Sequence, residues 1–372
     1  MDIDYKKTKV FSNPVKPSQG SDFTDYQKRE AKAVSAIKKA IPSSLKKNMV
    51  YGEGMFAELY SNDKVFPNHL MACAIDGVGT KLLLAEEMEK YDTIGIDLVA
   101  MSANDLATLG KVSPFLFIDY FAVQNEFEEM GLTGDLMKGI VKGLEMCDVG
   151  DILRSSIHVN IGKGETASVD EMVKGLKPGM GFDIAGGLIG FMKKEDLNTS
   201  VKVGDKIIAL KSSGAHSNGY TDLRLKFLKN RKIEDKFDGS TIGEILLEPT
   251  RIYSKTVAAI ADKVKLVGIN NTGYGLKNLN RVKGVQFEIN APIKPQPIFE
   301  LVQKETKFSD EDMYRKFNMG QGFFLIVDSK DADNAVSIAS KFKDEAKVIG
   351  EVKKGSGTVL LKDNKKILFE GY

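Results

Sequence analysis

Short apolar runs alternate with amphipathic segments in the first half of the chain, a pattern typical of strands followed by helices. The apolar run at 70–75 predicts a buried strand that ends at Asp76-Gly77. Helical periodicity follows at once, and the aromatic and β-branched residues further along indicate more strands. We expect helices at 81–90, 93–109 and 134–146 and strands at 115–123, 156–161 and 182–191.

Near residue 196 the pattern starts again, so we place a domain boundary there. A strand at 206–210 leads into a turn of small polar residues at 212–219 and a helix from Tyr220. We then expect a helix at 249–263, a turn at 268–275, a strand at 322–328, a helix at 331–342 and a hairpin around 362–365. Both halves contain a strand, a polar turn and a helix, which indicates two related units of the α+β class (mixed α/β).

The predicted organisation is therefore an arm and two domains. Residues 1–24 have no hydrophobic periodicity and are interpreted as an N-terminal arm, while 26–40 fit an amphipathic helix. The N-terminal domain spans 25–196 and the C-terminal domain 197–372.

Composition excludes several classes of protein. The chain of 372 residues has 53 Lys and Arg against 51 Asp and Glu. This balance is too even for broad electrostatic attraction of nucleic acid or anionic lipid. No apolar stretch reaches the roughly 18 residues of a spanning helix, and no secretion signal begins the chain. Two cysteines are too few for a disulfide framework, so we expect a cytoplasmic protein. From the charge balance and the lack of a spanning run we expect no nucleic-acid or membrane partner.

The first candidate site is the motif D-G-V-G-T-K at 76–81, which follows the first buried strand. Its glycines, Gly77 and Gly79, allow backbone to approach a ligand, Lys81 offers a cation to phosphate and Asp76 offers a carboxylate to a metal. A tight turn with a solvated lysine is the alternative. The motif is not a Walker loop, whose pattern occurs nowhere in the chain.

The second candidate lies on the apolar helix at 93–106. Asp97 and Asn104 are seven residues apart and project from one face, and Asp105 lies about 100° further round. A buried carboxylate needs compensation by internal hydrogen bonds or by a metal ion. We favour Mg²⁺ held together with Asp76 over a purely structural network.

A third candidate, G-K-G-E-T at 162–166, follows an apolar run. With Ala167 it matches the outline of a dinucleotide fingerprint, but it lacks the expected βαβ position. Asp183 fits the acidic ribose ligand only loosely, because it lies inside a strand-like run. Glu165 is interpreted as a second carboxylate ligand or a base, with helix capping as the alternative.

The turn at 212–219 gathers hydroxyl, imidazole and amide groups before a helix. We favour His216 as a polar substrate contact or acid/base over a histidine satisfied by its surroundings. No nucleophile elbow of a serine hydrolase is present. Arg251 follows Pro249 and could reach a phosphate or pair with a surface carboxylate.

Taken together, five segments resemble aminoimidazole ribonucleotide synthetases, the phosphoribosylformylglycinamidine cyclo-ligases of purine biosynthesis. They are the stretches 76–81, 91–105, 211–220, 247–253 and 313–320, and the resemblance runs from about Tyr51 to the C-terminus. It implies an ATP-driven ring closure in a homodimer whose N-terminal sheets pair into a barrel. The substrate would be formylglycinamidine ribonucleotide, whose formyl oxygen accepts the γ-phosphoryl group before the amidine nitrogen attacks.

The resemblance also implies roles for individual residues. Lys81 would contact ATP phosphates. The other predicted nucleotide contacts are Gly77, Gly79, Thr80, Asn104 and Arg251. Mg²⁺ or its waters would be held by Asp76, Asp97, Asp105 and Glu165, and whether a monovalent cation is also needed is left open. The reacting substrate would meet Ser213, His216 and Asn218.

Three segments depart from the family pattern. The chain has Y-G-E-G-M-F-A at 51–57 in place of a glycine-rich loop, and E-T-A-S-V-D at 165–170 in place of E-T-A-E-M-P. Its N-N-T-G-Y-G at 270–275 lacks a histidine and one glycine of the family's turn. Two alternatives therefore stay open, namely a related ATP-using enzyme with another substrate and a catalytically silent nucleotide-binding subunit.

Overall fold

The computed structural model describes residues 32, 35, 39–52 and 55–371. The chain divides into two compact units, Met1–Asn48 and Met49–Tyr372, and the described part of the first contains a short 3-10 helix at Ser43–Lys46. The predicted arm at 1–24 and most of the helix predicted at 26–40 lie outside the described residues. The second unit contains all the strands of the described residues.

The first half of this unit forms a seven-stranded sheet in the order β1-β2-β3-β7-β4-β5, with β6 also paired to β4. Its long central strands β3, β7 and β4 are antiparallel, whereas β5 and β6 run parallel to β4. The strands are β1 (Met49–Tyr51), β2 (Glu58–Ser61), β3 (His69–Gly77), β4 (Ser113–Val123), β5 (Asn160–Ile161), β6 (Glu165–Ser168) and β7 (Phe182–Lys193).

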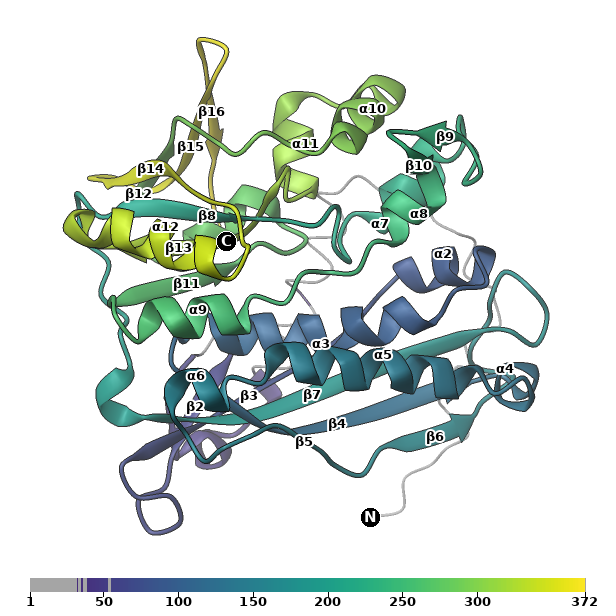
Figure 1. Ribbon diagram of the computed structural model, residues 1–372, viewed down its shortest axis with the longest axis horizontal. Coiled ribbons are helices and arrows are strands. Elements are labelled where there is room, and N and C mark those ends of the chain that lie inside the picture. The colour runs from purple at the N-terminus through teal and green to yellow at the C-terminus, as the bar shows by residue number, and fades with distance from the viewer. Residues whose placement is uncertain (1–31, 33–34, 36–38, 53–54, 372) are drawn as a thin grey trace. The chain divides into compact units, whose positions relative to one another are not determined.

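Helices α3 (Asp92–Ala107) and α5 (Leu132–Cys147) cover one face of this sheet (Figure 1). They cross at glycines, since a Cβ on Gly95 would lie 2.1 Å from the Leu136 carbonyl oxygen and one on Gly139 2.1 Å from that of Asp92. Such contact distances exclude any larger side chain at the crossing. Nearly every residue of α3 is buried as a result, its polar ones included.

The second half forms another seven-stranded sheet, in the order β11-β13-β8-β14-β12-β15-β16. Helices α9 (Ser254–Ala261) and α12 (Ala332–Lys341) pack against it, and α9 also contacts α3 (Figure 1). The strands are β8 (Lys206–Lys211), β11 (Leu266–Asn270), β12 (Gln286–Ile289), β13 (Gln321–Val327), β14 (Ala346–Lys353), β15 (Gly357–Lys362) and β16 (Lys365–Phe369).

Shorter elements join these layers. The remaining helices are α2 (Lys81–Glu87), α4 (Asn125–Glu129), α6 (Gly150–Leu153), α7 (Tyr220–Asp222), α8 (Ile242–Leu247), α10 (Pro297–Thr306) and α11 (Asp310–Lys316). Strands β9 (Lys236–Phe237) and β10 (Ser240–Thr241) form a two-stranded hairpin. A π-helical turn spans Leu223–Phe227. 3-10 turns lie at Lys194–Asp196, Gly275–Arg281 and Ser329–Asp331. The predicted boundary at 196 falls between β7 and β8.

Two predicted elements are wrong for identifiable reasons. The strand predicted at 156–161 shrinks to β5, because the amides of Ile157 and Val159 donate to Ser155 Oγ and Asp148 Oδ2 instead of a strand partner. The turn predicted at 268–275 begins too early, because Leu266–Asn270 is the fully buried strand β11. Gly268 serves close packing there, since a Cβ would lie 2.7 Å from Thr108 Cα.

The helix predicted at 249–263 begins only at Ser254. The residues before it are held in another conformation by side chains of α3, described below. The G-x-G-x-x-A segment leads into strand β6 rather than a helix, which excludes the dinucleotide fingerprint and the helix cap considered for Glu165. The α+β class with two sheets is confirmed.

Candidate active site

Lys81 lies at the start of α2, and its side chain is completely buried. Its ammonium donates to Asp97 Oδ1 at 3.0 Å, the His216 carbonyl at 3.1 Å and the Glu248 carbonyl at 2.7 Å, and it lies 2.8 Å from Asp97 Oδ2. Burial lowers the pKa of Lys81 from its ordinary value, and the adjacent Asp97 carboxylate opposes that shift. All three ammonium protons are therefore directed at protein oxygens.

Asp97 is the centre of a network that joins the two halves of the unit. Besides Lys81, its Oδ1 accepts hydrogen bonds from Ser217 Oγ at 3.0 Å, Thr250 N at 2.7 Å and Thr250 Oγ1 at 2.6 Å. These partners compensate the buried charge, as such a group requires. Internal hydrogen bonds, one of the two possibilities left open by the sequence, are what the structure shows at Asp97.

Asn104 binds the same segment two turns further along α3. Its Oδ1 accepts from Tyr253 N at 2.9 Å and its Nδ2 donates to the Arg251 carbonyl at 2.8 Å. A single face of α3 thus holds the backbone of 250–253, which is why α9 starts late. The Arg251 side chain pairs with Asp344 Oδ1 at 2.7 Å, the carboxylate alternative considered from the sequence.

The turn at 212–219 is fixed by its own side chains. Ser213 Oγ donates to the Pro249 carbonyl at 2.6 Å, and the buried His216 Nε2 accepts from Ser213 N at 3.3 Å. Burial, with the nearby charges of Lys81 and Arg251, lowers the pKa of His216 to about 3. The imidazole is therefore neutral at physiological pH, with its proton on Nδ1 by elimination, and its Nε2 holds the backbone of the turn at Ser213.

Asp76, at the end of β3, lies close enough to Asp105 on α3 for the two carboxylates to interact electrostatically. Burial raises the pKa of Asp105 to about 7, and the neighbouring Asp76 carboxylate raises it as well, against a hydrogen bond from Asn270. That bond joins Asn270 Nδ2 to Asp105 Oδ1 at 2.8 Å. Partial desolvation also raises the pKa of Asp76, against a hydrogen bond that its Oδ1 accepts from Gly77 N at 2.8 Å. Sequence reasoning missed Asn270 as a partner, although a polar residue ending a fully buried strand is a usable signal.

This carboxylate pair fits a divalent cation, and the rest of the predicted metal set lies elsewhere. Two like charges held together in a partly desolvated place are stabilised by such an ion, and Mg²⁺ commonly takes one or two carboxylates plus water and phosphate. Asp97 is occupied by its own donors. Across the sheet Glu165 pairs with Tyr120, Tyr120 with Ala185 and Ala185 with Gly77, so three strand spacings, about 14 Å, separate it from the pair. No three His, Cys, Asp or Glu side chains among the described residues converge on one point.

The other predicted contacts surround these groups. Gly79 has a φ of +72°, and a Cβ placed on it would point into open space. Thr80 Oγ1 lies 3.4 Å from Thr221 Oγ1, and a Cβ on Gly77 would lie 3.0 Å from the Ile184 carbonyl oxygen. A Cβ on Gly273 would lie 3.2 Å from Asn218 Oδ1, so the altered turn packs against a predicted substrate contact.

Comparison with known families gives two consecutive matches. Residues 60–192 match the N-terminal domain of AIR synthase related proteins, and 202–362 match the C-terminal domain. The phosphoribosylformylglycinamidine cyclo-ligase of Methanosarcina acetivorans is 38% identical over 343 residues, covering 90% of this chain and 93% of the relative. That of Caldanaerobacter subterraneus subsp. tengcongensis is 36% identical over 341 residues, covering 89% and 96%.

Solved structures with the same fold are more distant in sequence. HypE in the HypE–HypF complex superposes with a TM-score of 0.58 at 18% identity, over 91% of this chain and 99% of that one. AaThiL in complex with AMPPCP and TMP gives 0.58 at 13% identity, over 91% and 94%. At such identities the likeness shows the fold alone. No helix in the described part of the chain is long and apolar enough to cross a membrane.

Proposed function

The chain belongs to the AIR synthase family, and from its kinship with the cyclo-ligases we propose that it converts formylglycinamidine ribonucleotide into aminoimidazole ribonucleotide, consuming ATP. The observation that supports this most strongly is the 38% identity to a curated cyclo-ligase over nine-tenths of the chain. The reaction belongs to purine biosynthesis, and we propose that it takes place in the cytoplasm, in keeping with two unpaired cysteines.

An amide carbonyl is a poor electrophile, so ring closure needs its oxygen converted into a leaving group. In the proposed reaction the γ-phosphoryl group of ATP is transferred to the formyl oxygen, the amidine nitrogen attacks the formyl carbon, and ADP and phosphate are released. Such chemistry depends on positioning and charge neutralisation more than on a covalent enzyme intermediate. We assign the nucleotide to the strand end at Gly77, Gly79 and Thr80, and the reacting substrate to Ser213 and Asn218.

Mg²⁺, bound by Asp76 and Asp105, would neutralise charge on the ATP phosphates. For Lys81 and Asp97 we propose a different role from the phosphate and metal contacts expected from sequence. Because they bind both the His216 carbonyl and the segment at Thr250, they fix the 212–219 turn relative to α3. They act as positioning residues, and His216 supports the same turn from within.

We further propose a homodimer formed through the open face of the first sheet. Within the described part of the unit from Met49 to Tyr372, helices cover only the other face of that sheet (Figure 1). Ile75, Gly187 and Ile118 stand directly across from one another in β3, β7 and β4. In this row Ile75 is 74% exposed and Ile118 41%, and Tyr120, two residues further along β4, is 44% exposed. These exposed apolar side chains favour pairing with a second copy.

Release of ADP by the purified protein tests the proposal. With Mg²⁺-ATP and formylglycinamidine ribonucleotide we expect ADP and aminoimidazole ribonucleotide in equal amounts, and no ADP without the ribonucleotide. ADP formation that ignores this substrate would indicate a related enzyme acting on another molecule, an alternative favoured by the altered turn against Asn218. Nucleotide binding without any turnover would indicate a silent subunit.

A further inference from the structure

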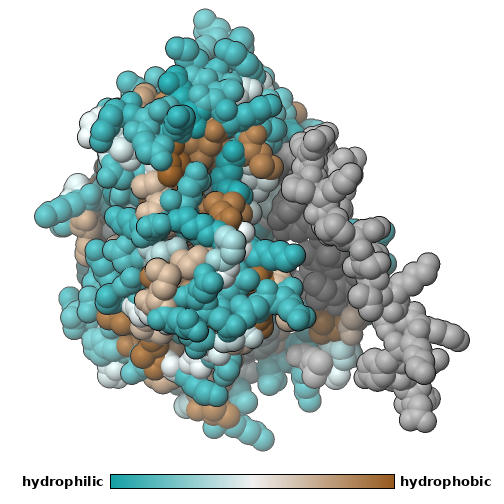
Figure 2. Space-filling model, turned by 90° about the vertical axis from the view of Figure 1, so that its right-hand side faces the viewer, coloured by the Kyte–Doolittle hydropathy of each residue, from teal (hydrophilic) through white to brown (hydrophobic). Residues whose placement is uncertain are grey.

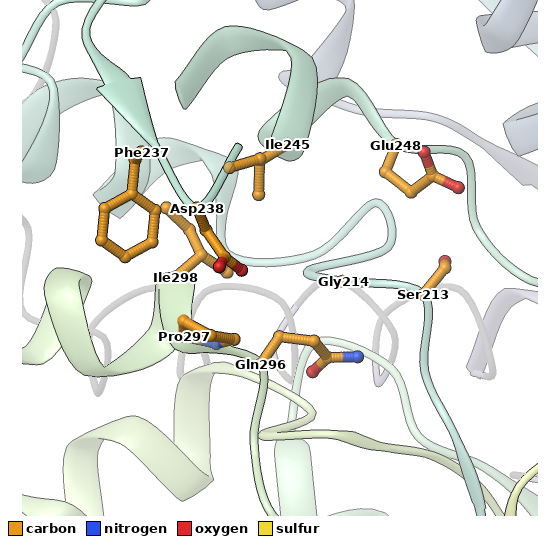
Figure 3. A pocket seen from close by; sticks show the side chains of 9 residues that line it. All are labelled: Ser213, Gly214, Phe237, Asp238, Ile245, Glu248, Gln296, Pro297 and Ile298. Carbon is orange, nitrogen blue, oxygen red and sulfur yellow. The ribbon is translucent and has the colours of Figure 1, made fainter. Parts of the chain in front are cut away.

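A cavity of about 240 Å³ lies beside Ser213 in the C-terminal half (Figure 3). Its walls come from the 212–219 turn, the β9–β10 hairpin, α8 with the residue after it, and the first residues of α10. Figure 2 shows the side of the molecule with these elements, where small hydrophobic groups interrupt a mainly hydrophilic surface. The lining residues are Ser213, Gly214, Phe237, Asp238, Ile245, Glu248, Gln296, Pro297 and Ile298.

The polar groups at this cavity are mostly hydrogen-bond acceptors. Ser213 Oγ gives its proton to the Pro249 carbonyl and Gln296 Nε2 donates to the Ser212 carbonyl at 2.5 Å, which leaves oxygen lone pairs. Asp238 and Glu248 add two carboxylates, and Figure 3 shows Asp238 on the side of Phe237 and Ile298 and Glu248 on the side of Ser213.

No lysine, arginine or histidine is among the described residues that line the cavity. In the part of the chain that the structure describes, neither carboxylate has an ion-pair partner within 4.0 Å, and the Lys81 ammonium, which donates to the Glu248 backbone carbonyl, attracts the Glu248 carboxylate only from outside the lining. The cavity therefore repels phosphate and favours a cation with several N–H donors. Phe237, Ile245 and Ile298 supply apolar walls against which a small planar group can pack.

We propose that this cavity binds the amidine end of the substrate, with Glu248 and Asp238 accepting its N–H groups. The inference rests on the proposed function, whose substrate carries an amidine. An amidine is a strong base and is a planar cation at neutral pH, so its chemistry matches the acceptors and the apolar walls. Holding the nitrogen that becomes the exocyclic amine leaves the ribose-bearing nitrogen directed toward the formyl carbon. The amidinium must lose a proton as that nitrogen attacks, and the Glu248 carboxylate accepts this proton. The anionic phosphates of ATP are excluded from this cavity.

Steady-state kinetics of Glu248→Gln and Asp238→Asn test the assignment. Each change removes a charge at nearly constant size, and Asn tolerates the left-handed backbone of Asp238, whose φ is +47°. Loss of a charge-assisted hydrogen bond should raise the KM for formylglycinamidine ribonucleotide by about tenfold or more, with the KM for ATP unchanged. Glu300→Gln is the matched control, since Glu300 is an exposed carboxylate on α10 that does not line the cavity.

Acetamidine provides a second probe that does not depend on turnover. It should bind the wild-type protein, detected by NMR titration, and compete with the ribonucleotide but not with ATP; the double variant should lose this binding. A wild-type enzyme that turns over, with both KM values unchanged in the variants, would overturn the inference and leave the proposed function intact. A wild-type protein without turnover would refute the proposed function. In that case, acetamidine binding that is lost in the double variant would still support amidine recognition by the cavity. Absence of acetamidine binding to the wild-type protein would refute amidine recognition as well.

Discussion

Replacing Lys81 with methionine removes the buried ammonium at nearly constant side-chain length. Asp97 then keeps its hydrogen bonds from Ser217 and Thr250 but loses its only cationic partner within 4.0 Å among the described residues, and two backbone carbonyls lose a donor. Breaking a buried pair in this way costs about 3–5 kcal/mol. Because three donors remain at Asp97, we expect the lower end, about 3 kcal/mol, in the free energy of unfolding.

Thermal unfolding at one scan rate measures the effect. At about 1–2 °C per kcal/mol for a unit of this size, the melting temperature of Lys81→Met should fall by about 3–6 °C. The double variant Lys81→Met/Asp97→Leu, which leaves no buried charge, should recover part of this loss. Nucleotide affinity of the folded variant should stay near wild type while kcat falls, since the 212–219 turn is no longer fixed.

An unchanged melting temperature combined with a large loss of ATP affinity would refute this reasoning. It would return Lys81 to the phosphate-binding role expected from its glycine-rich motif. A double variant less stable than Lys81→Met would show that Asp97 stabilises the fold without needing its lysine.

Further predictions concern the metal pair, the buried histidine and the open sheet face. Asp105→Asn should abolish Mg²⁺-dependent turnover in a folded protein. In the wild type a proton competes with Mg²⁺ for the Asp105 carboxylate, whose pKa is about 7, so the apparent Mg²⁺ affinity should weaken about tenfold per pH unit below 7. A Mg²⁺ affinity independent of pH would exclude Asp105 as a ligand. His216→Ala should lower kcat more than ATP affinity. The pKa of His216 is about 3 in the folded state against an ordinary 6.5, so the unfolded chain binds a proton at this residue first as the pH falls. The free energy of unfolding, measured with urea, should therefore fall between pH 6.5 and 3 in the wild type. It should fall less steeply in His216→Ala, which lacks this group. Ile75→Asp should give a monomer in light scattering, because loss of about 1.5–3 kcal/mol of apolar burial in each copy weakens dimerisation by about two to four powers of ten. The control Val65→Asp, in an exposed loop, should stay dimeric. A dimeric Ile75→Asp protein would place the interface elsewhere.

The sequence predicts what local periodicity determines. Helical spacing correctly placed Asp97 and Asn104 on one buried face of α3, and strand composition located β3, β4, β7, β8 and β13 to within a few residues. The partners of that face could not be predicted, because Ser217 and Thr250 are 120 and 153 residues away from Asp97 along the chain. Only the packing of the two halves brings them together.

The same limit applies to individual residues of the site. Lys81 follows two glycines, a context that resembles a phosphate loop, and its burial depends on α3 and on residues 216 and 248. Phe237 and Gln296 line the cavity but belong to no motif, so no local signal identified them. Glu165 matched a ligand type but lies three strands away from the carboxylate pair.

The polar face of α3 also has a consequence for how the chain folds. Residues 250–253 take their conformation from hydrogen bonds to Asp97 and Asn104, which are synthesised about 150 residues earlier. During synthesis the N-terminal half can fold first and present α3 as a template for the half that follows. Expressed alone, the C-terminal half would lack that template, whereas the N-terminal half would have to bury or hydrate an unpaired Asp97. Separate expression of the two halves is thus a poor route to active protein, and mixing them should restore what neither half has alone.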